Sequence, residues 1–118
     1  MNWSFHFSLQ ADSRWLETVD EVAAAAARQA GEDAGDAARV GQTVAAAARL
    51  VMAASAGAGE DVALQFDARD GRLDVRLRYI PDAPGAGDVA ISRGSLDSVE
   101  FSREGRFTVC WLSRKLPD

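Results

Sequence analysis

Hydrophobic and polar residues alternate at the start of the chain, in the segment NWSFHFSLQ. The large apolar side chains share one face: Trp3, Phe5, Phe7 and Leu9. The other face is polar and carries Ser4, His6 and Ser8. A period of two residues is typical of a strand with one buried side, so we predict a half-buried strand here.

The next segment repeats apolar residues at helical spacing. Asp12 or Ser13 supplies an N-cap, acidic residues follow near the positive end of the helix, and Gly31 closes it. The predicted buried stripe consists of Trp15, Val19, Val22, Ala26 and Ala30.

A second helix follows the capping run GEDAGD and ends at the glycine-rich stretch Gly57 to Gly59. Its predicted buried stripe consists of Val40, Val44, Ala47, Val51 and Ala54. Arg39, Gln42 and Arg49 mark a narrow solvent-facing edge. Because most of its circumference is apolar, we expect this helix to be central.

Two hairpins are predicted in the second half of the chain. The first joins VALQFDA to RLDVRLRYI through Asp70-Gly71, and the second turns at Glu104-Gly105 within VEFSREGRFTVCWLSRKL. A brief helix is expected at ISRGSLD, between them. Early helices and late strands predict an α+β fold: a two-layer sandwich whose mostly antiparallel sheet is covered by helices on one face, as a single domain over residues 1–118.

Composition narrows the classes of function. The chain has 118 residues, is 47% hydrophobic and carries a net charge of −5, which disfavours nucleic-acid binding. It contains no apolar run of roughly 18 residues and no leader pattern, so we expect a cytoplasmic protein without membrane contact. Its single cysteine, Cys110, lies in an apolar run and is interpreted as a buried structural thiol.

Candidate chemistry is sparse. His6 is the only histidine and lies among polar strand positions, which favours a solvated imidazole over a catalytic base. One histidine and one cysteine cannot build a zinc site, and the carboxylates are scattered over caps and turns. Gly85-Ala86-Gly87 lacks the ending of a P-loop and the spacing of a dinucleotide fingerprint. Trp3 and Trp111 fit either a core or an interface.

The order of elements nevertheless resembles one family. The phrases that carry the resemblance are FSLQADSRWLETVDEVAAAAARQAG, RLVMAAS, DGRLDVRLRY and GAGDVAISRGSLDSVEFSREGRFTVCWLSRKL. Together they resemble the anti-sigma-factor serine kinases of the Bergerat (GHKL, histidine-kinase-like) ATPase superfamily over nearly the whole chain. The resemblance rests on element order and apolar pattern more than on signature residues.

The resemblance implies a nucleotide cleft whose key residues are missing. Active members carry a glutamate and, four residues later, an asparagine on the second helix, and these positions fall at Ala46 and Leu50. Neither side chain can ligate magnesium or accept a proton. The adenine-binding Asp-x-Gly motif falls at Tyr79 and Pro81. Independently of any alignment, no Asn or Glu occurs between Gly41 and Ser55.

The phosphate side of the implied cleft is also incomplete. Gly85 and Gly87 match the family's glycines in part, but Asp88 follows them and would repel a phosphate. Only a few residues separate Pro81 from Gly85, which leaves almost no room for the family's lid. We therefore interpret Ala46, Leu50, Tyr79, Pro81, Gly85 and Gly87 as a vestigial nucleotide cleft.

The hypothesis that follows is a non-catalytic regulatory module that binds a protein and has lost ATP, with no catalytic residues and no metal. The implied partner is a sigma factor or an anti-sigma antagonist. A homodimer is a further alternative. One alternative is an ATP- and magnesium-dependent serine kinase that takes a carboxylate from Asp82 or Asp88. Another is a small-molecule binder that reuses the cleft between Leu50 and Tyr79.

Overall fold

The computed structural model describes residues 2–82 and 91–117. Its elements follow one another in this order: β1 (Trp3–Leu9), the 3-10 turn η1 (Ser13–Trp15), α1 (Leu16–Gln29), α2 (Ala34–Ser55), the 3-10 turn η2 (Ala56–Ala58), β2 (Val62–Arg69), β3 (Arg72–Tyr79), β4 (Ser98–Glu104) and β5 (Phe107–Lys115).

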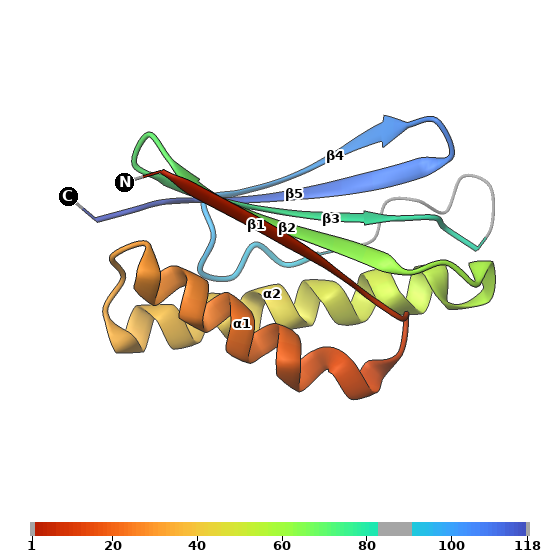
Figure 1. Ribbon diagram of the computed structural model, residues 1–118, viewed down its shortest axis with the longest axis horizontal. Helices are drawn as coiled ribbons and strands as arrows, with labels where there is room; N and C mark the ends of the chain where they lie inside the picture. Colours follow the sequence, from red (N-terminus) through yellow and green to blue (C-terminus); the bar gives the residue numbers. More distant parts are fainter. Residues whose placement is uncertain (1, 83–90, 118) are drawn as a thin grey trace.

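The strands form one antiparallel sheet in the order β1-β2-β3-β5-β4, with β1 and β4 at the edges. Both helices lie against the same face of this sheet, and the opposite face is uncovered by the described helices (Figure 1). The predicted two-layer α+β sandwich with a mostly antiparallel sheet is therefore confirmed.

The helix ends lie where capping chemistry predicts them. The Asp12 side chain accepts from the Arg14 backbone N–H at 3.0 Å and starts η1, which leads into α1. Asp33 caps α2 by accepting from the Asp36 N–H at 2.8 Å. Gly31 follows α1 with a positive φ, which glycine adopts without steric cost.

The buried faces of the helices agree with most of the predicted stripes. On α2, Val40, Val44, Ala47 and Val51 are fully buried and Ala54 is half-buried. On α1, the buried face is broader than predicted because this helix packs against both α2 and the sheet. Its buried residues are Val19, Ala23, Ala24, Ala26 and Ala27, whereas Trp15, Val22 and Ala30 are half-buried.

The two helices approach each other closely at Gly41 of α2. A Cβ atom at this position would lie 2.6 Å from the backbone oxygen of Asp20 and 3.0 Å from the Cβ of Ala24. Contacts this short do not occur between real side chains, so glycine allows the crossing. The alanine-rich sequences of α1 and α2 thus set the short distance between them.

The first hairpin turns at Asp70 and Gly71, as predicted, and both residues have a positive φ. The second turns at Gly105 and Arg106, one residue later than predicted, because Glu104 still pairs with Phe107. The brief helix predicted at ISRGSLD is wrong. Residues 91–97 form a loop with a turn at Gly94, whose φ of +54° is incompatible with a right-handed helix.

Candidate functional site

The solvent-facing edge of α2 carries an apolar ridge formed by Ala46, Leu50 and Ala53. All three side chains are exposed, and 39% of Leu50 is accessible to solvent. Residues spaced four and three apart lie on one face of a helix, so the three side chains are adjacent. We call this set the α2 ridge. It includes both helix positions that the resemblance assigns to glutamate and asparagine.

A shallow hollow of about 190 Å³ lies beside the α2 ridge at Ala46. Its walls are Gln42, Thr43 and Ala46 of α2 and Ser92 and Gly94 of the 91–97 loop. The lining groups are an amide, two hydroxyls and a methyl group, all neutral. Because residue 94 is glycine, no side chain separates the loop backbone from Thr43 of α2.

Thr43 holds the 91–97 loop against α2. Its hydroxyl donates to the Arg39 carbonyl at 2.9 Å, and it therefore accepts from the Ser95 hydroxyl at 3.1 Å and from the Ser95 N–H at 3.4 Å. A Cβ at Gly94 would lie 2.7 Å from Thr43 Oγ1, and its φ is positive, so both space and backbone require glycine. The contact between the loop and α2 therefore depends on Thr43, Gly94 and Ser95.

A buried ion pair fixes the same loop from the other side. Arg114 of β5 donates to both carboxylate oxygens of Glu32, at 2.7 and 3.1 Å, and to the Ser95 carbonyl at 2.5 Å. The hydrogen bond to Glu32 outweighs desolvation and raises the pKa of Arg114 above its ordinary value. Because the Glu32 side chain is only 2% exposed, this pair links the α1–α2 turn, β5 and the loop inside the molecule.

The remaining predicted cleft residues lie elsewhere. Tyr79 is fully buried at the end of β3, and Pro81 is half-buried just beyond it, and neither lines the hollow at Ala46. Gly85, Gly87 and Asp88 lie outside the described residues. The structure thus brings Ala46 and Leu50 together on the α2 ridge, but it does not place Tyr79 with them around the hollow.

The carboxylate, histidine and cysteine side chains decide which catalytic or metal-binding chemistry the described residues offer. The Asp82 carboxylate lies at the far end of α2, where it would contact a Cβ on Gly57 at 3.2 Å, and its N–H donates to the Ala54 carbonyl. Within residues 2–82 and 91–117, no three His, Cys, Asp or Glu side chains gather closely enough to hold a metal ion. His6 is exposed and Cys110 is buried, as predicted.

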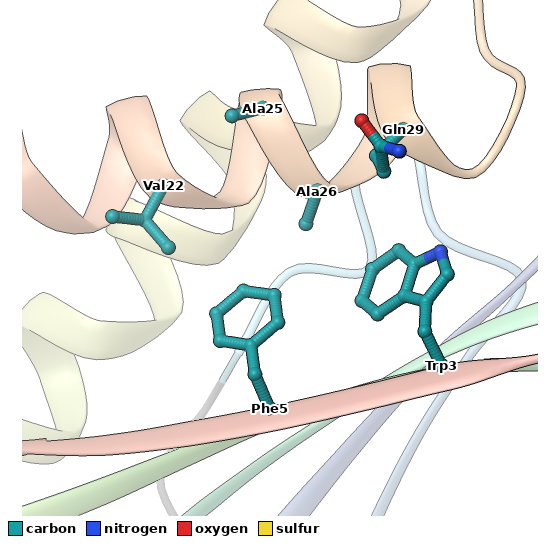
Figure 2. Close-up of a pocket in the computed structure, with 6 residues that line it drawn as sticks. All are labelled: Trp3, Phe5, Val22, Ala25, Ala26 and Gln29. Carbon is teal, nitrogen blue, oxygen red and sulfur yellow. The ribbon is translucent and has the colours of Figure 1, made fainter.

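A larger apolar hollow, of about 310 Å³, lies between β1 and α1 and was not predicted. Figure 2 shows Trp3 and Phe5 of β1 pointing toward α1, with Val22, Ala25, Ala26 and Gln29 on the opposite wall. The alternation of β1 predicted that these aromatic rings face inward, yet Phe5 remains 38% exposed because β1 is an edge strand. The sequence alone could not show that α1 leaves part of the edge strand β1 uncovered.

Stacked aromatic rings form the floor of that hollow. Phe5 stacks on Phe66 at 5.0 Å between ring centroids and on Trp3 at 5.6 Å. The Trp3 indole nitrogen is buried and has no hydrogen-bond partner in the described structure. These contacts fix the rings in place and leave an apolar surface at the sheet edge.

Comparisons with known proteins find no protein-family model that matches this chain and no curated protein that matches it. The relation to the Bergerat superfamily therefore stays a prediction from the sequence. In the part of the chain that the structure describes, neither helix has the length and apolar character needed to cross a membrane.

Proposed function

We propose that this chain is a non-catalytic regulatory module that binds a signalling protein and has lost ATP binding. The observation that carries the proposal is the α2 ridge. At the two helix positions where the resemblance implies a general base and a magnesium ligand, the helix exposes the methyl group of Ala46 and the isobutyl group of Leu50.

The hollow beside the ridge offers little to a nucleotide. Magnesium in ATP sites is held by carboxylates together with phosphate oxygens, whereas Gln42, Thr43 and Ser92 supply only neutral groups. The 91–97 loop also occupies the space over Thr43, where it is held by hydrogen bonds and a tight backbone contact. These features support the proposal that this surface no longer carries out phosphoryl transfer.

The same features favour a protein partner. An exposed leucine between two alanines lets a second helix approach closely, which is how amphipathic helices dock on one another. Arg49 and Gln42 flank the ridge with polar groups, as at the rim of an interface. By the resemblance, the partner class is a sigma factor or an anti-sigma antagonist.

Two matched variants test the role of the α2 ridge. The tagged chain is used to capture its partner from host extract, and Leu50→Glu is expected to lower the captured amount at least about tenfold because it buries a charge in the interface. Ala38→Glu places the same charge on an exposed position of α2 away from the ridge and is expected to retain the partner. Equal capture by both variants would contradict the proposal.

The captured complex is then incubated with γ-labelled Mg·ATP. No labelled phosphate is expected on either protein. Transfer of phosphate to a serine of the partner would overturn the proposal in favour of the kinase alternative, in which Asp82 or Asp88 supplies a ligand.

A further inference from the structure

The open face of the sheet is positively charged along its three central strands. Residues that alternate with the buried ones on β2, β3 and β5 point away from the helices. Five of them are cationic: Arg69, Arg72, Arg76, Arg78 and Lys115. Only two carboxylates, Asp67 and Asp74, occupy the same face of these strands. A local excess of positive charge therefore exists in a chain whose net charge is −5.

Two of these arginines lie on aromatic rings. The Arg78 guanidinium is 3.6 Å from the centroid of Phe107, and that of Arg76 is 4.8 Å from the centroid of Trp111. The Trp111 indole N–H donates to the Ser102 hydroxyl at 3.0 Å, which fixes the ring. Cation–π contacts and this hydrogen bond hold the guanidinium groups in place before a partner arrives.

Val109 lies between Phe107 and Trp111 on β5 and pairs with Arg78 of β3. Although Val109 faces away from the helices, it is only 2% exposed. The open face therefore has an apolar centre with ordered cations over it. Trp, Phe and Arg are enriched at protein–protein interfaces.

The carboxylates of this face pair only part of its positive charge. Asp74 accepts from the Ser113 hydroxyl at 2.6 Å, and Asp67 accepts from the Gln65 amide at 3.3 Å. Arg69 and Arg76 reach Asp67 only at 3.5 and 3.8 Å, and Arg76 Nε is buried with no hydrogen-bond partner in the described structure. Because that Nε is buried, the donors that an outside carboxylate can reach belong to the more exposed side chains: Arg69, which is 57% exposed, and Arg78, which is 46% exposed and whose Nε lies 3.5 Å from Glu104 of β4.

We propose that this open face, centred on Arg76, Arg78, Phe107 and Trp111, binds an acidic segment of a partner protein. Charge complementarity carries the choice of occupant: an acidic segment gains both the arginine donors and the aromatic surface. This surface lies on the sheet, opposite the helix layer that carries the α2 ridge (Figure 1), so it goes beyond the proposed function.

The charges along β4 argue against a nucleic acid. Glu100 and Glu104 point to the same side as Trp111 and Phe107 and border the basic strands. They would repel a continuous phosphate backbone, and the net charge of the chain opposes it as well. A short acidic segment can keep its carboxylates over β2 and β3, where Glu104, 3.5 Å from the Arg78 guanidinium, is the glutamate that it has to displace.

The test is a titration of the full chain, labelled with ¹⁵N, followed by amide chemical shifts. The probe is a short fluorescein-labelled peptide of glutamate, aspartate and glycine with one central phenylalanine. A matched peptide carries glutamine and asparagine at the acidic positions, and an oligothymidylate serves as the nucleic-acid probe. We expect saturable shifts only with the acidic peptide, confined to residues around Arg76, Arg78, Phe107 and Trp111 and weakened by added salt.

Charge-reversed variants complete the experiment. Arg78→Glu is expected to weaken acidic-peptide binding at least about tenfold, because Arg78 is 46% exposed and stacks on the central ring. Arg39→Glu makes the same charge change on the helix layer and is expected to leave binding within about twofold. The amide spectra show whether each variant stays folded.

Absence of acidic-peptide binding, shifts that map to α2 or β1, or equal losses in both variants would overturn this proposal. Tighter binding of the oligothymidylate would overturn it in favour of a nucleic-acid surface. The proposed function is tested separately, by partner capture with Leu50→Glu and by labelled Mg·ATP, so failure here is distinct from failure of the proposed function.

Discussion

Asp67 illustrates how a single polar residue is held on the open face of the sheet. Burial opposes its ionisation, but hydrogen bonds from Ser4 and Gln65 and the charges of Arg76 and Arg69 outweigh this effect, and the pKa of Asp67 is lowered below 3.8. A carboxyl whose pKa is lower in the folded chain stabilises the fold above the unfolded pKa. The stabilisation is lost as pH falls through the folded value.

We therefore predict that Asp67→Asn lowers the free energy of unfolding by about 1–2 kcal/mol at pH 7. The difference from the unmodified chain should shrink as pH falls below about 4. Urea unfolding over a series of pH values measures both quantities. The exposed Asp61→Asn serves as the control, and a difference for Asp67→Asn that stays constant down to pH 2 contradicts the account.

Glu32 and Arg114 offer a second residue-scale test. Glu32→Gln removes the buried charged partner of Arg114 and leaves it Asp36 at 4.0 Å, and it is expected to cost about 2–4 kcal/mol in unfolding free energy. Amide hydrogen exchange at Ser95 should accelerate as the loop loosens. Glu60→Gln, which removes an exposed and distant pair with Arg106, is expected to change stability by less than about 0.5 kcal/mol. Similar losses of unfolding free energy in both variants would contradict a stabilising role for the pair of Glu32 and Arg114.

At the scale of elements, sequence predicted most of the structure because local patterns decide it. The caps at Asp12 and Asp33, the Asp70-Gly71 turn and the apolar spacing of both helices depend on residues close in the chain. The prediction of a helix at residues 91–97 was wrong because contacts with residues distant in the chain determine the backbone conformation of this segment. Thr43, 52 positions from Ser95, and Arg114 hold this segment as a loop.

The crossing of α1 and α2 gives a prediction at this scale. Gly41→Ala gains helix propensity, yet its Cβ would collide with the backbone of Asp20, so we expect a net loss of about 1–3 kcal/mol in unfolding free energy. Gly35→Ala in the same helix meets only Asp33 Oδ1 at 3.5 Å and is expected to gain about 0.5–1 kcal/mol. Thermal unfolding of the two variants compares them directly. Stabilisation by both would contradict the close crossing.

At the scale of the whole molecule, two different surfaces are exposed on opposite layers. The α2 ridge is apolar and belongs to the helix layer, whereas the open sheet face is basic and aromatic. Sequence placed Ala46 and Leu50 on one helix edge because their spacing alone determines it. It could not place Tyr79 inside the core, nor pair Arg76 with Trp111, because strand order and register bring those residues together.

The most direct test of the central claim, that the chain has lost ATP binding, is a thermal-shift titration with Mg·ATP. We predict an unchanged Tm up to millimolar nucleotide. A ligand at 100 times its dissociation constant would add about 2.7 kcal/mol, or roughly 10 °C in a domain of this size. A saturable rise in Tm at sub-millimolar Mg·ATP would contradict the claim.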